Sequence, residues 1–304
     1  MAQPAPIPTS DSPEFLRRHM PHNPPLEYLL TTGSEAFFVV PVEQMYQHIP
    51  RAVPPTRAIA HSCLFLTSGT ATMRVGTDSY TIQAGELLIV RAGQVFSFAP
   101  GDINTGFLCH FHPDFLLGTA ASGVGVTYEF LQFWGKPYLS LDTATAGFVR
   151  QLLHRLLVEY QEHRLTYPDV LRAYLLALLS ELNRAYAASS PGTPTAATQL
   201  TNCFKQLLAT SLRELHQVGE YAERLHVTPN HLAKAVRTTT GKSPARWIEQ
   251  TIVLEAKVLL YQSQLTISEI AQEVGVADPS YFSRLFRKHE GVTPLGFRKR
   301  MATS

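Results

Sequence analysis

The stretch IAQEVGVADPSYFSRLFRKHEGVTPLGFR, residues 270–298, decides the fold of the C-terminal third of the chain. A second stretch, TPNHLAKAVRTTTGKSP at residues 228–244, repeats the pattern of residues 278–294 at an offset of 50. An internal repeat predicts two copies of one supersecondary unit. The matched positions are prolines, a glycine, and the apolar and cationic residues between them: Pro229/Pro279, Leu232/Phe282, Lys234/Arg284, Val236/Phe286, Arg237/Arg287, Gly241/Gly291 and Pro244/Pro294.

Each copy predicts a helix-turn-helix unit, whose longer helix has clear ends. Thr228 or Asp278 can cap the start of this helix, and each is followed by proline at the first helical position. Gly241 and Gly291 suit the left-handed conformation that ends such helices. Two matched sets of caps therefore predict two equivalent helices.

The shorter helix of each unit precedes the longer one. In the second copy it is expected to begin at Thr266, which has capping-box spacing to Glu269, and in the first copy near Gly219. Residues 244–262, PARWIEQTIVLEAKVLLYQ, predict a helix between the units. Such a helix would span about 28 Å at ~1.5 Å per residue, a length suited to holding two helices near the ~34 Å repeat of successive major grooves.

The outward faces of the two longer helices carry residue types that contact DNA. Arginine and lysine bond guanine, asparagine bonds adenine, and hydroxyl groups bond phosphates. A helical bundle that binds no nucleic acid is the alternative, but it does not account for matched caps and matched cationic faces. We predict that double-stranded DNA is a partner, contacted by Asn230, His231, Lys234, Arg237, Ser280, Tyr281, Ser283, Arg284, Arg287 and Lys288.

Residues from about 213 to 300 resemble the DNA-binding domain of the AraC/XylS family. Val276 departs from the pattern, because the family usually has an aromatic residue there. The resemblance implies promoter binding in a bacterium, with activation through RNA polymerase commoner than repression, and often a small β-barrel ahead of the DNA-binding part. It is carried by Ile270, Ala271, Gly275, Ser280, Tyr281, Phe282, Arg284, Phe286, Lys288, Gly291, Pro294, Phe297 and Arg298.

Composition is that of a soluble protein of about two domains. The 304 residues are 45% apolar and 16% charged, and the three cysteines are too few and scattered for a disulfide framework or zinc ribbon. Residues 211–304 hold 13 basic against 9 acidic residues, whereas residues 1–210 hold 13 against 15. With no secretion signal and no membrane-length apolar run, we expect a cytoplasmic protein that joins the bacterial nucleoid when bound to DNA and does not enter a membrane.

The fold class we predict is multidomain α+β. Short strands with glycine-bearing turns, such as CLFLTSG and SYTIQAG, predict a small cupin-like β-barrel that acts as a sensor. Helical periodicity then follows, and after it a segment rich in proline and small residues. The predicted parts are a flexible arm at 1–25, the barrel at 26–142, a helical dimerisation or coupling segment at 143–190, a linker at 191–200 and an all-α DNA-binding domain at 201–304.

The barrel offers weak candidates for an effector site. Gly85–Gly93 resembles the second cupin motif, but Arg91 replaces its proline and Phe96 stands where a metal-binding histidine is expected. Leu87, Ile89 and Arg91 are expected to share one strand face. Arg91, His61 and His110 are the candidate effector residues; the alternatives are a surface arginine and a half-buried His110 ahead of a turn at His112. We expect no metal, no cofactor and no enzymatic activity.

The predicted function is a transcription regulator that responds to a small-molecule effector. One alternative is a regulator whose barrel only dimerises or binds a protein, and another is a metal-dependent cupin enzyme fused to a DNA-binding domain. Residues 143–190 have more apolar positions than a small barrel needs, which favours a homodimer interface there. The alternative is that these helices only cover the barrel.

Overall fold

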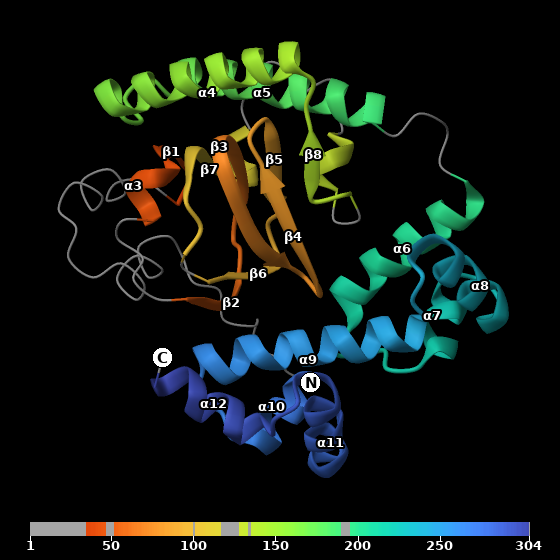
Figure 1. Cartoon of the computed structure of the whole chain (residues 1–304). Helices are drawn as coiled ribbons and strands as arrows, with labels where there is room; N and C mark the ends of the chain where they lie inside the picture. The colour runs from red at the N-terminus through yellow and green to blue at the C-terminus, as the bar shows by residue number, and fades with distance from the viewer. Residues whose placement is uncertain are drawn as a thin grey trace. The chain divides into compact units, whose positions relative to one another are not determined.

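The computed structural model describes residues 35–46, 52–99, 101–116, 128–132, 135–189 and 195–303. The predicted arm at residues 1–25 lies outside them. The chain divides between residues 191 and 192 into two compact units, called here the N-terminal and C-terminal units. Figure 1 shows the strands in the first and a cluster of helices in the second. None of the described helices has the length and hydropathy that a membrane span requires.

The N-terminal unit contains an eight-stranded antiparallel sheet followed by two long helices. A short helix, α3 (Val42–Tyr46), follows the first strand, and two 3-10 turns, η1 (Pro113–Leu116) and η3 (Glu129–Leu131), precede the last. The strands are β1 (Phe37–Pro41), β2 (Val53–Arg57), β3 (His61–Val75), β4 (Asp78–Gln83), β5 (Glu86–Val90), β6 (Val95–Phe98), β7 (Asn104–Phe111) and β8 (Tyr138–Ser140).

Strand β3 organises the sheet because it belongs to two layers. Its first half pairs with β5 and β7, and its second half pairs with β4 and β6. A register shift between Leu66 and Ser68 marks a β-bulge, which bends a strand. Five of the described strands pair in the order β1-β7-β3-β5-β8. Of the others, β4 and β6 pair with β3, and β2 pairs with β6, so the described strands do not close into a ring. The predicted barrel is therefore corrected to an open, two-layered β-structure bent around β3.

The two faces of β5 are buried in different cores, as the alternation predicted. Leu87 and Ile89 pack with the two long helices that follow the sheet. Leu88 and Val90 pack with apolar residues from the second half of β3 and from β4. The space between the two layers is thus occupied by apolar side chains.

Helices α4 (Thr143–His163) and α5 (Pro168–Ser189) lie side by side across the sheet (Figure 1). Their leucines, including Leu153, Leu156 and Leu178, are fully buried in the same core as the sheet face. Covering the sheet therefore accounts for most apolar positions of residues 143–190. Phe148 and Tyr167 are exceptions, because 51% and 55% of them are exposed.

The C-terminal unit is all helical, as predicted. Helix α9 runs through its centre, with α6, α7 and α8 at one end and α10, α11 and α12 at the other (Figure 1). One apolar core, containing Phe204, Ile252, Leu259 and Phe286, joins the two ends. The helices are α6 (Ala196–Ser211), α7 (Val218–Arg224), α8 (Pro229–Thr240), α9 (Pro244–Gln262), α10 (Ile267–Glu273), α11 (Pro279–Glu290) and α12 (Pro294–Thr303).

The predicted linker at 191–200 overlaps the first helix of this unit. The side chain of Thr195 accepts a hydrogen bond from the amide of Thr198 and so caps α6, which begins at Ala196. Residues 196–200 are therefore helical. The run of alanine and threonine that looked like a linker is a capped first turn.

Candidate functional site

The two longer helices of the repeat, α8 and α11, are built alike. Thr228 and Asp278 are their N-caps and proline follows each, as the sequence predicted. Gly241 and Gly291 end them with φ of 71° and 73°. Residues 231–238 and 281–288 have the same order of buried and exposed positions. Local sequence therefore sets both the ends of these helices and the faces that they present.

The outward faces of α8 and α11 hold the predicted DNA-contact residues. The buried stripes are Leu232, Ala235 and Val236 in α8, and the equivalent Phe282, Leu285 and Phe286 in α11. Ser283 is partly buried, like its equivalent in α8. The other predicted residues are exposed: Asn230, His231, Lys234, Arg237, Ser280, Tyr281, Arg284, Arg287 and Lys288.

The cations on these faces differ in how they are held. Among the described residues, no ion pair engages Lys234 or Arg237 on α8. On α11, the guanidinium of Arg284 lies 3.9 Å from a carboxylate oxygen of Asp278. The amine of Lys288 is 2.8 Å from Oε2 of Glu249. Helix α8 therefore presents its charge unpaired, whereas part of the charge of α11 is already neutralised.

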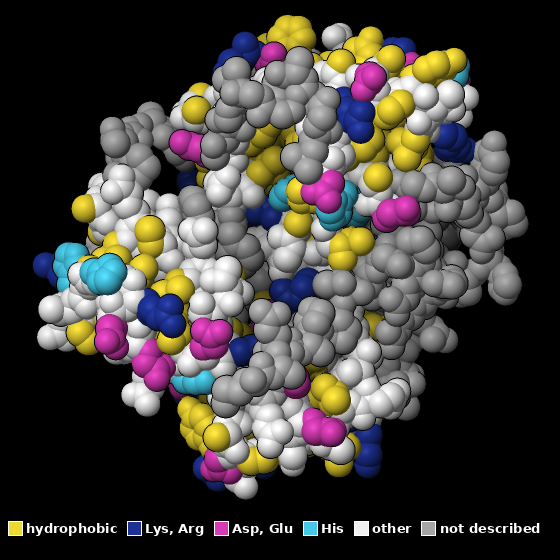
Figure 2. Space-filling view, turned by 180° about the vertical axis from the view of Figure 1, so that it is seen from behind, with side chains coloured by type: hydrophobic (Ala, Val, Ile, Leu, Met, Phe, Trp, Pro, Cys, Tyr) yellow, Lys and Arg dark blue, Asp and Glu magenta, His cyan; other side chains and the backbone are white. Residues whose placement is uncertain are grey.

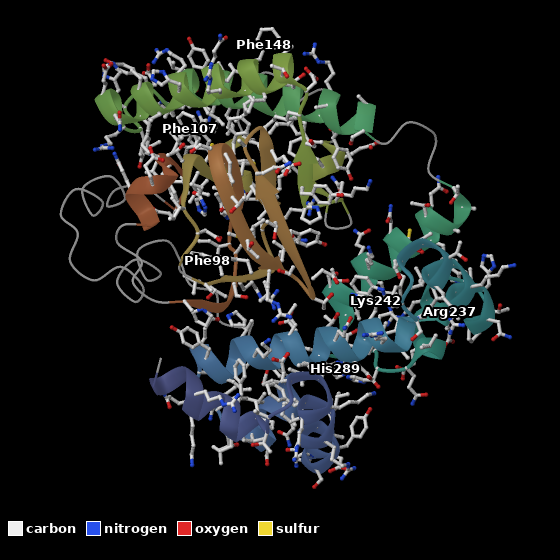
Figure 3. The ribbon with its side chains drawn as sticks, in the orientation of Figure 1. Phe98, Phe107, Phe148, Arg237, Lys242 and His289 are labelled. Carbon is white, nitrogen blue, oxygen red and sulfur yellow. The ribbon has the colours of Figure 1, made fainter. Side chains whose placement is uncertain are left out.

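Glu249 on α9 is a residue that the sequence analysis missed. Its carboxylate accepts a hydrogen bond from Lys288 and is also 2.9 Å from Nε2 of His289 (labelled in Figure 3). Partial burial opposes the charge of Glu249, but these hydrogen bonds outweigh it and hold its pKa below the usual range. Glu249 thus ties the C-terminal half of α11 to α9. Nothing local in the sequence indicates a pair 39 positions apart.

A second cationic cluster lies where α8 passes into α9. The amines of Lys205 and Lys242 each lie 4.9 Å from the centre of the Trp247 ring. The indole nitrogen of Trp247 donates a hydrogen bond to the hydroxyl of Thr240. Lys242 and Arg237 are labelled in Figure 3. These cation–π contacts hold positive charge beside the end of α8.

On the face shown in Figure 2, basic, acidic and hydrophobic side chains are interspersed, without a large patch of one charge. The outward faces of α8 and α11 are the elements that combine cations with hydrogen-bonding groups.

In the N-terminal unit, Arg91 is a buried residue, so the surface interpretation was wrong. Only 1% of it is exposed. Nε donates to the carbonyl of Phe130 and Nη2 donates to that of Lys136, both at 2.8 Å. Nη1 has no hydrogen-bond partner among the described residues. Burial lowers the pKa of Arg91 to about 10. Arg91 therefore fastens the segment around η3 to the end of β5.

The structure brings together two of the three candidate effector residues. His61 lies on the strand face of Cys63, beside Arg91, whereas His110 faces the other way and bonds Ser62 through Nδ1 at 2.9 Å. Burial lowers the pKa of His61 to about 4 and that of His110 to about 3.

The strand that carries His110 ends in a turn. At His112, Nδ1 accepts a hydrogen bond from the amide of Asp114, so this histidine stabilises the turn. His110 itself is only 9% exposed, so it is more deeply buried than the half-buried position expected from the sequence. In the described part of the chain, no group of three or more His, Cys, Asp or Glu side chains is placed to hold a metal ion.

Two family models match the chain, one in each unit. Residues 43–179 match the model of an AraC-like ligand binding domain. Residues 221–300 match the model of a helix-turn-helix domain. The first match spans strands β2 to β8, all of α4 and about half of α5, and the second spans the repeat.

Among curated proteins, the HTH-type transcriptional activator RhaR of Escherichia coli is 27% identical over 164 residues. The match covers 54% of this chain and 58% of that protein, so the chain spans little more than half the length of its relative. Among solved structures, the C-terminal domain of the response regulator AraT from Geobacillus stearothermophilus is 26% identical and covers 36% of this chain and 88% of that one, with a TM-score of 0.32.

A second solved structure, that of ToxT from Vibrio cholerae, is similar over more of the chain. It is 14% identical and covers 86% of this chain and 98% of that one, with a TM-score of 0.44. The family assignment depends on the two model matches and on the repeat that fills the second of them. The chain belongs to the AraC family, with an AraC-like ligand binding domain followed by a helix-turn-helix domain.

Proposed function

We propose that the protein is a sequence-specific DNA-binding transcription regulator rather than an enzyme. The observation that supports this proposal is the equivalence of α8 and α11. Both helices have the same caps, the same buried stripe and an outward face of cationic and hydrogen-bonding side chains. They lie at opposite ends of α9, whose 19 residues span about 28 Å at ~1.5 Å each.

In this proposal the two helices enter successive major grooves on one face of the duplex. No described residue forms an ion pair with Lys234, Arg237 or Arg287, so these cations are available to guanine edges or phosphates. Asn230 suits adenine, and the hydroxyls of Ser280 and Tyr281 suit phosphates. Lys288 contributes less in this scheme, because Glu249 already engages its amine.

The N-terminal unit is proposed to bind a small-molecule effector that changes the affinity for DNA. The match of residues 43–179 to a ligand binding domain supports this. The candidate contacts for an effector are the buried Arg91 and the partly buried His61, with His110 as a third candidate on the opposite strand face. An effector acts by binding one conformation more tightly than another.

Dimerisation through α4 and α5 is the proposed assembly. Phe148 on α4, Val170 on α5 and Tyr167 just before α5 are exposed at 51%, 38% and 55%. Figure 3 shows Phe148 on the side of α4 that points away from the sheet. Activation through RNA polymerase and a cytoplasmic site of action follow from the same proposal, as does the alternative of a unit that only dimerises.

Selection of DNA from a random pool, followed by fluorescence anisotropy, tests the proposal. We expect an enriched sequence to bind at least ~10³-fold more tightly than scrambled DNA. Lys234→Ala and Arg284→Ala should each weaken binding to the enriched sequence about 10-fold, or ~1–3 kcal/mol. Lys136→Ala is the control, because it removes one exposed lysine outside the C-terminal unit.

Two outcomes would contradict this proposal. One is a pool from which no sequence is enriched. The other is an equal loss for Lys136→Ala and Lys234→Ala, which would mean that net charge alone drives binding. Equal losses on enriched and scrambled DNA would instead assign Lys234 and Arg284 to phosphate contacts.

A further inference from the structure

A groove beside the core that α4 shares with the sheet is a candidate ligand site of the N-terminal unit. It lies where α3, the end of β1, the middle of β3 and the start of β7 meet α4, and its volume is about 720 Å³. Pockets for small ligands usually measure ~300–1,000 Å³. Phe107, labelled in Figure 3, lies below α4 at this place. The residues that line the groove are Pro41, Glu43, Thr67, Thr105, Gly106, Phe107, Arg150, Gln151, His154 and Leu157.

The helical wall of the groove can bind an anion. Arg150, Gln151 and His154 come from one side of α4, since residues four apart on a helix are neighbours. All three are exposed, and no described residue forms an ion pair with Arg150. An unpaired guanidinium binds a carboxylate through two parallel hydrogen bonds. This wall therefore has a free cation with an amide and an imidazole beside it.

The opposite wall, from the sheet and α3, can bind hydroxyl groups. The hydroxyls of Thr67 and Thr105 lie 2.8 Å apart at the β-bulge of β3. The carboxylate of Glu43 uses Oε2 to accept a hydrogen bond from the amide of Gly106 at 3.2 Å. No described residue forms a hydrogen bond with its other oxygen, which can accept one from a hydroxyl donor. Side-chain hydroxyls both donate and accept, so this wall complements a molecule with several hydroxyl groups.

The backbone of this wall is built closely enough to hold its shape. A Cβ added to Gly106 would lie 2.0 Å from the carbonyl oxygen of Phe65, so no other residue fits without a shift. The ring of Phe107 and the side chain of Leu157 supply apolar surface between the two polar walls. A carbon skeleton can pack there while its polar groups reach either side.

We propose that this groove binds a small hydroxy acid, a molecule with a carboxylate at one end and hydroxyl groups along its chain. The carboxylate bonds Arg150, with His154 and Gln151 beside it, and the hydroxyls bond Glu43, Thr67 and Thr105. A simple fatty acid would leave the Glu43 wall unpaired, and a neutral polyol would leave Arg150 unpaired. The proposal rests on the proposed function of an effector-binding unit and goes beyond it, because it names the effector class and a groove between the sheet and α4 that lies apart from Arg91, His61 and His110.

Occupation of the groove has a mechanical consequence. The ligand bonds α4 on one side and the bulge of β3 and β7 on the other. It therefore favours the conformation in which helix and sheet are held together, as a ligand favours whichever state it bridges. Since α4 packs along α5, the position of the helix pair becomes sensitive to the ligand.

Thermal unfolding and calorimetry of the full chain with three six-carbon probes test the proposal. D-gluconate has both the carboxylate and the hydroxyls, D-sorbitol has the hydroxyls alone and hexanoate has the carboxylate alone. At equal concentration and ionic strength, we expect D-gluconate to raise Tm and the other two to leave it unchanged. A shift with sorbitol or hexanoate equal to that with gluconate would overturn the assignment to a hydroxy acid.

Two variants and one control locate the binding. Arg150→Gln and Glu43→Gln should each weaken D-gluconate binding at least 10-fold, with Tm in the absence of ligand unchanged. Arg184→Gln is the control, because Arg184 is an exposed arginine on α5 outside the groove. No D-gluconate binding, or binding that both groove variants retain, would overturn the proposal.

DNA binding measured on the same preparations separates this proposal from the proposed function. Loss of the hydroxy-acid site leaves selection of DNA by the C-terminal unit intact. Conversely, gluconate binding by a chain that selects no DNA would overturn the proposed function and leave the site in place.

Discussion

The imidazole of His216 lies directly against Gly275. A Cβ on residue 275 would be 1.9 Å from Nε2 of His216, and the glycine has φ of 81°, so both space and backbone conformation require glycine there. His216 precedes α7 of the first helix-turn-helix unit, and Gly275 is in the turn of the second. An ion pair between Arg213 and Glu273 at 3.1 Å lies beside this contact. The two helix-turn-helix units of the C-terminal unit therefore touch directly, in addition to sharing α9.

Gly275→Ala should destabilise the C-terminal unit by roughly 2–5 kcal/mol, because a left-handed backbone strain and a steric clash add together. Urea denaturation followed by circular dichroism measures the change. Gly219→Ala is the matched control, since nothing lies within 4 Å of a Cβ at this helical position. We expect the control to be neutral or stabilising by up to about 1 kcal/mol. Equal effects of the two substitutions would show that the His216 contact is unimportant.

The stability of Arg91 variants should depend on the charge of the new side chain as well as on its size. Arg91→Met removes two hydrogen bonds and leaves two buried carbonyls unpaired, at a cost of roughly 1–3 kcal/mol. Arg91→Lys keeps a buried charge that cannot reach both carbonyls, so we expect it to be less stable than Arg91→Met by at least about 1 kcal/mol. Calorimetric unfolding of both variants tests the order. A lysine variant as stable as the natural protein would contradict the bridging role.

Stability of the N-terminal unit should fall as the pH is lowered below about 6.5. Burial lowers the pKa of His61 to about 4 and that of His110 to about 3, so between these values and 6.5 the unfolded chain binds more protons than the folded one. Arg91 and His112 beside His61 add to its shift. Across that window, each histidine lowers the free energy of unfolding by up to about 1.4 kcal/mol for each pH unit of acidification.

Calorimetry at pH 7 and pH 5 measures this loss, with the His61→Gln, His110→Gln double variant as the comparison. The natural protein should lose more stability over that interval than the variant does. An identical loss in both proteins would mean that other groups control the acid response.

Only one of the three thiols should react in the folded protein. Cys63 and Cys109 face each other across β3 and β7 and are fully buried, whereas Cys203 on α6 is exposed. Burial raises the pKa of Cys63 to about 12 and raises that of Cys109 as well, which makes both thiols poor nucleophiles. Ellman titration should give one fast thiol in buffer and three in denaturant, and Cys203→Ser should remove the fast one. Fast reaction of a second thiol would show that the strands open readily.

The sequence by itself determined the features that depend on short-range rules. The caps at Thr228 and Asp278, the glycines at the ends of α8 and α11, and the capping box at Thr266 all involve residues within four positions of one another. Helical periodicity also determined which faces of α8 and α11 point outward, and strand alternation determined the two faces of β5. Such patterns depend on backbone geometry, which neighbouring residues control.

Tertiary structure alone decided the features that join distant segments. Four features show this: the pairing of Glu249 with Lys288, the burial of Arg91 under η3, the contact of His216 with Gly275 and the meeting of Glu43 with Arg150 in one groove. The residues that they join are from 39 to 107 positions apart along the chain. The strand order, in which the described strands do not close into a ring, was likewise not given by the alternation that predicted a barrel. These features follow from how elements pack, because packing depends on the combined shape and charge of many side chains and not on the spacing of any local pattern.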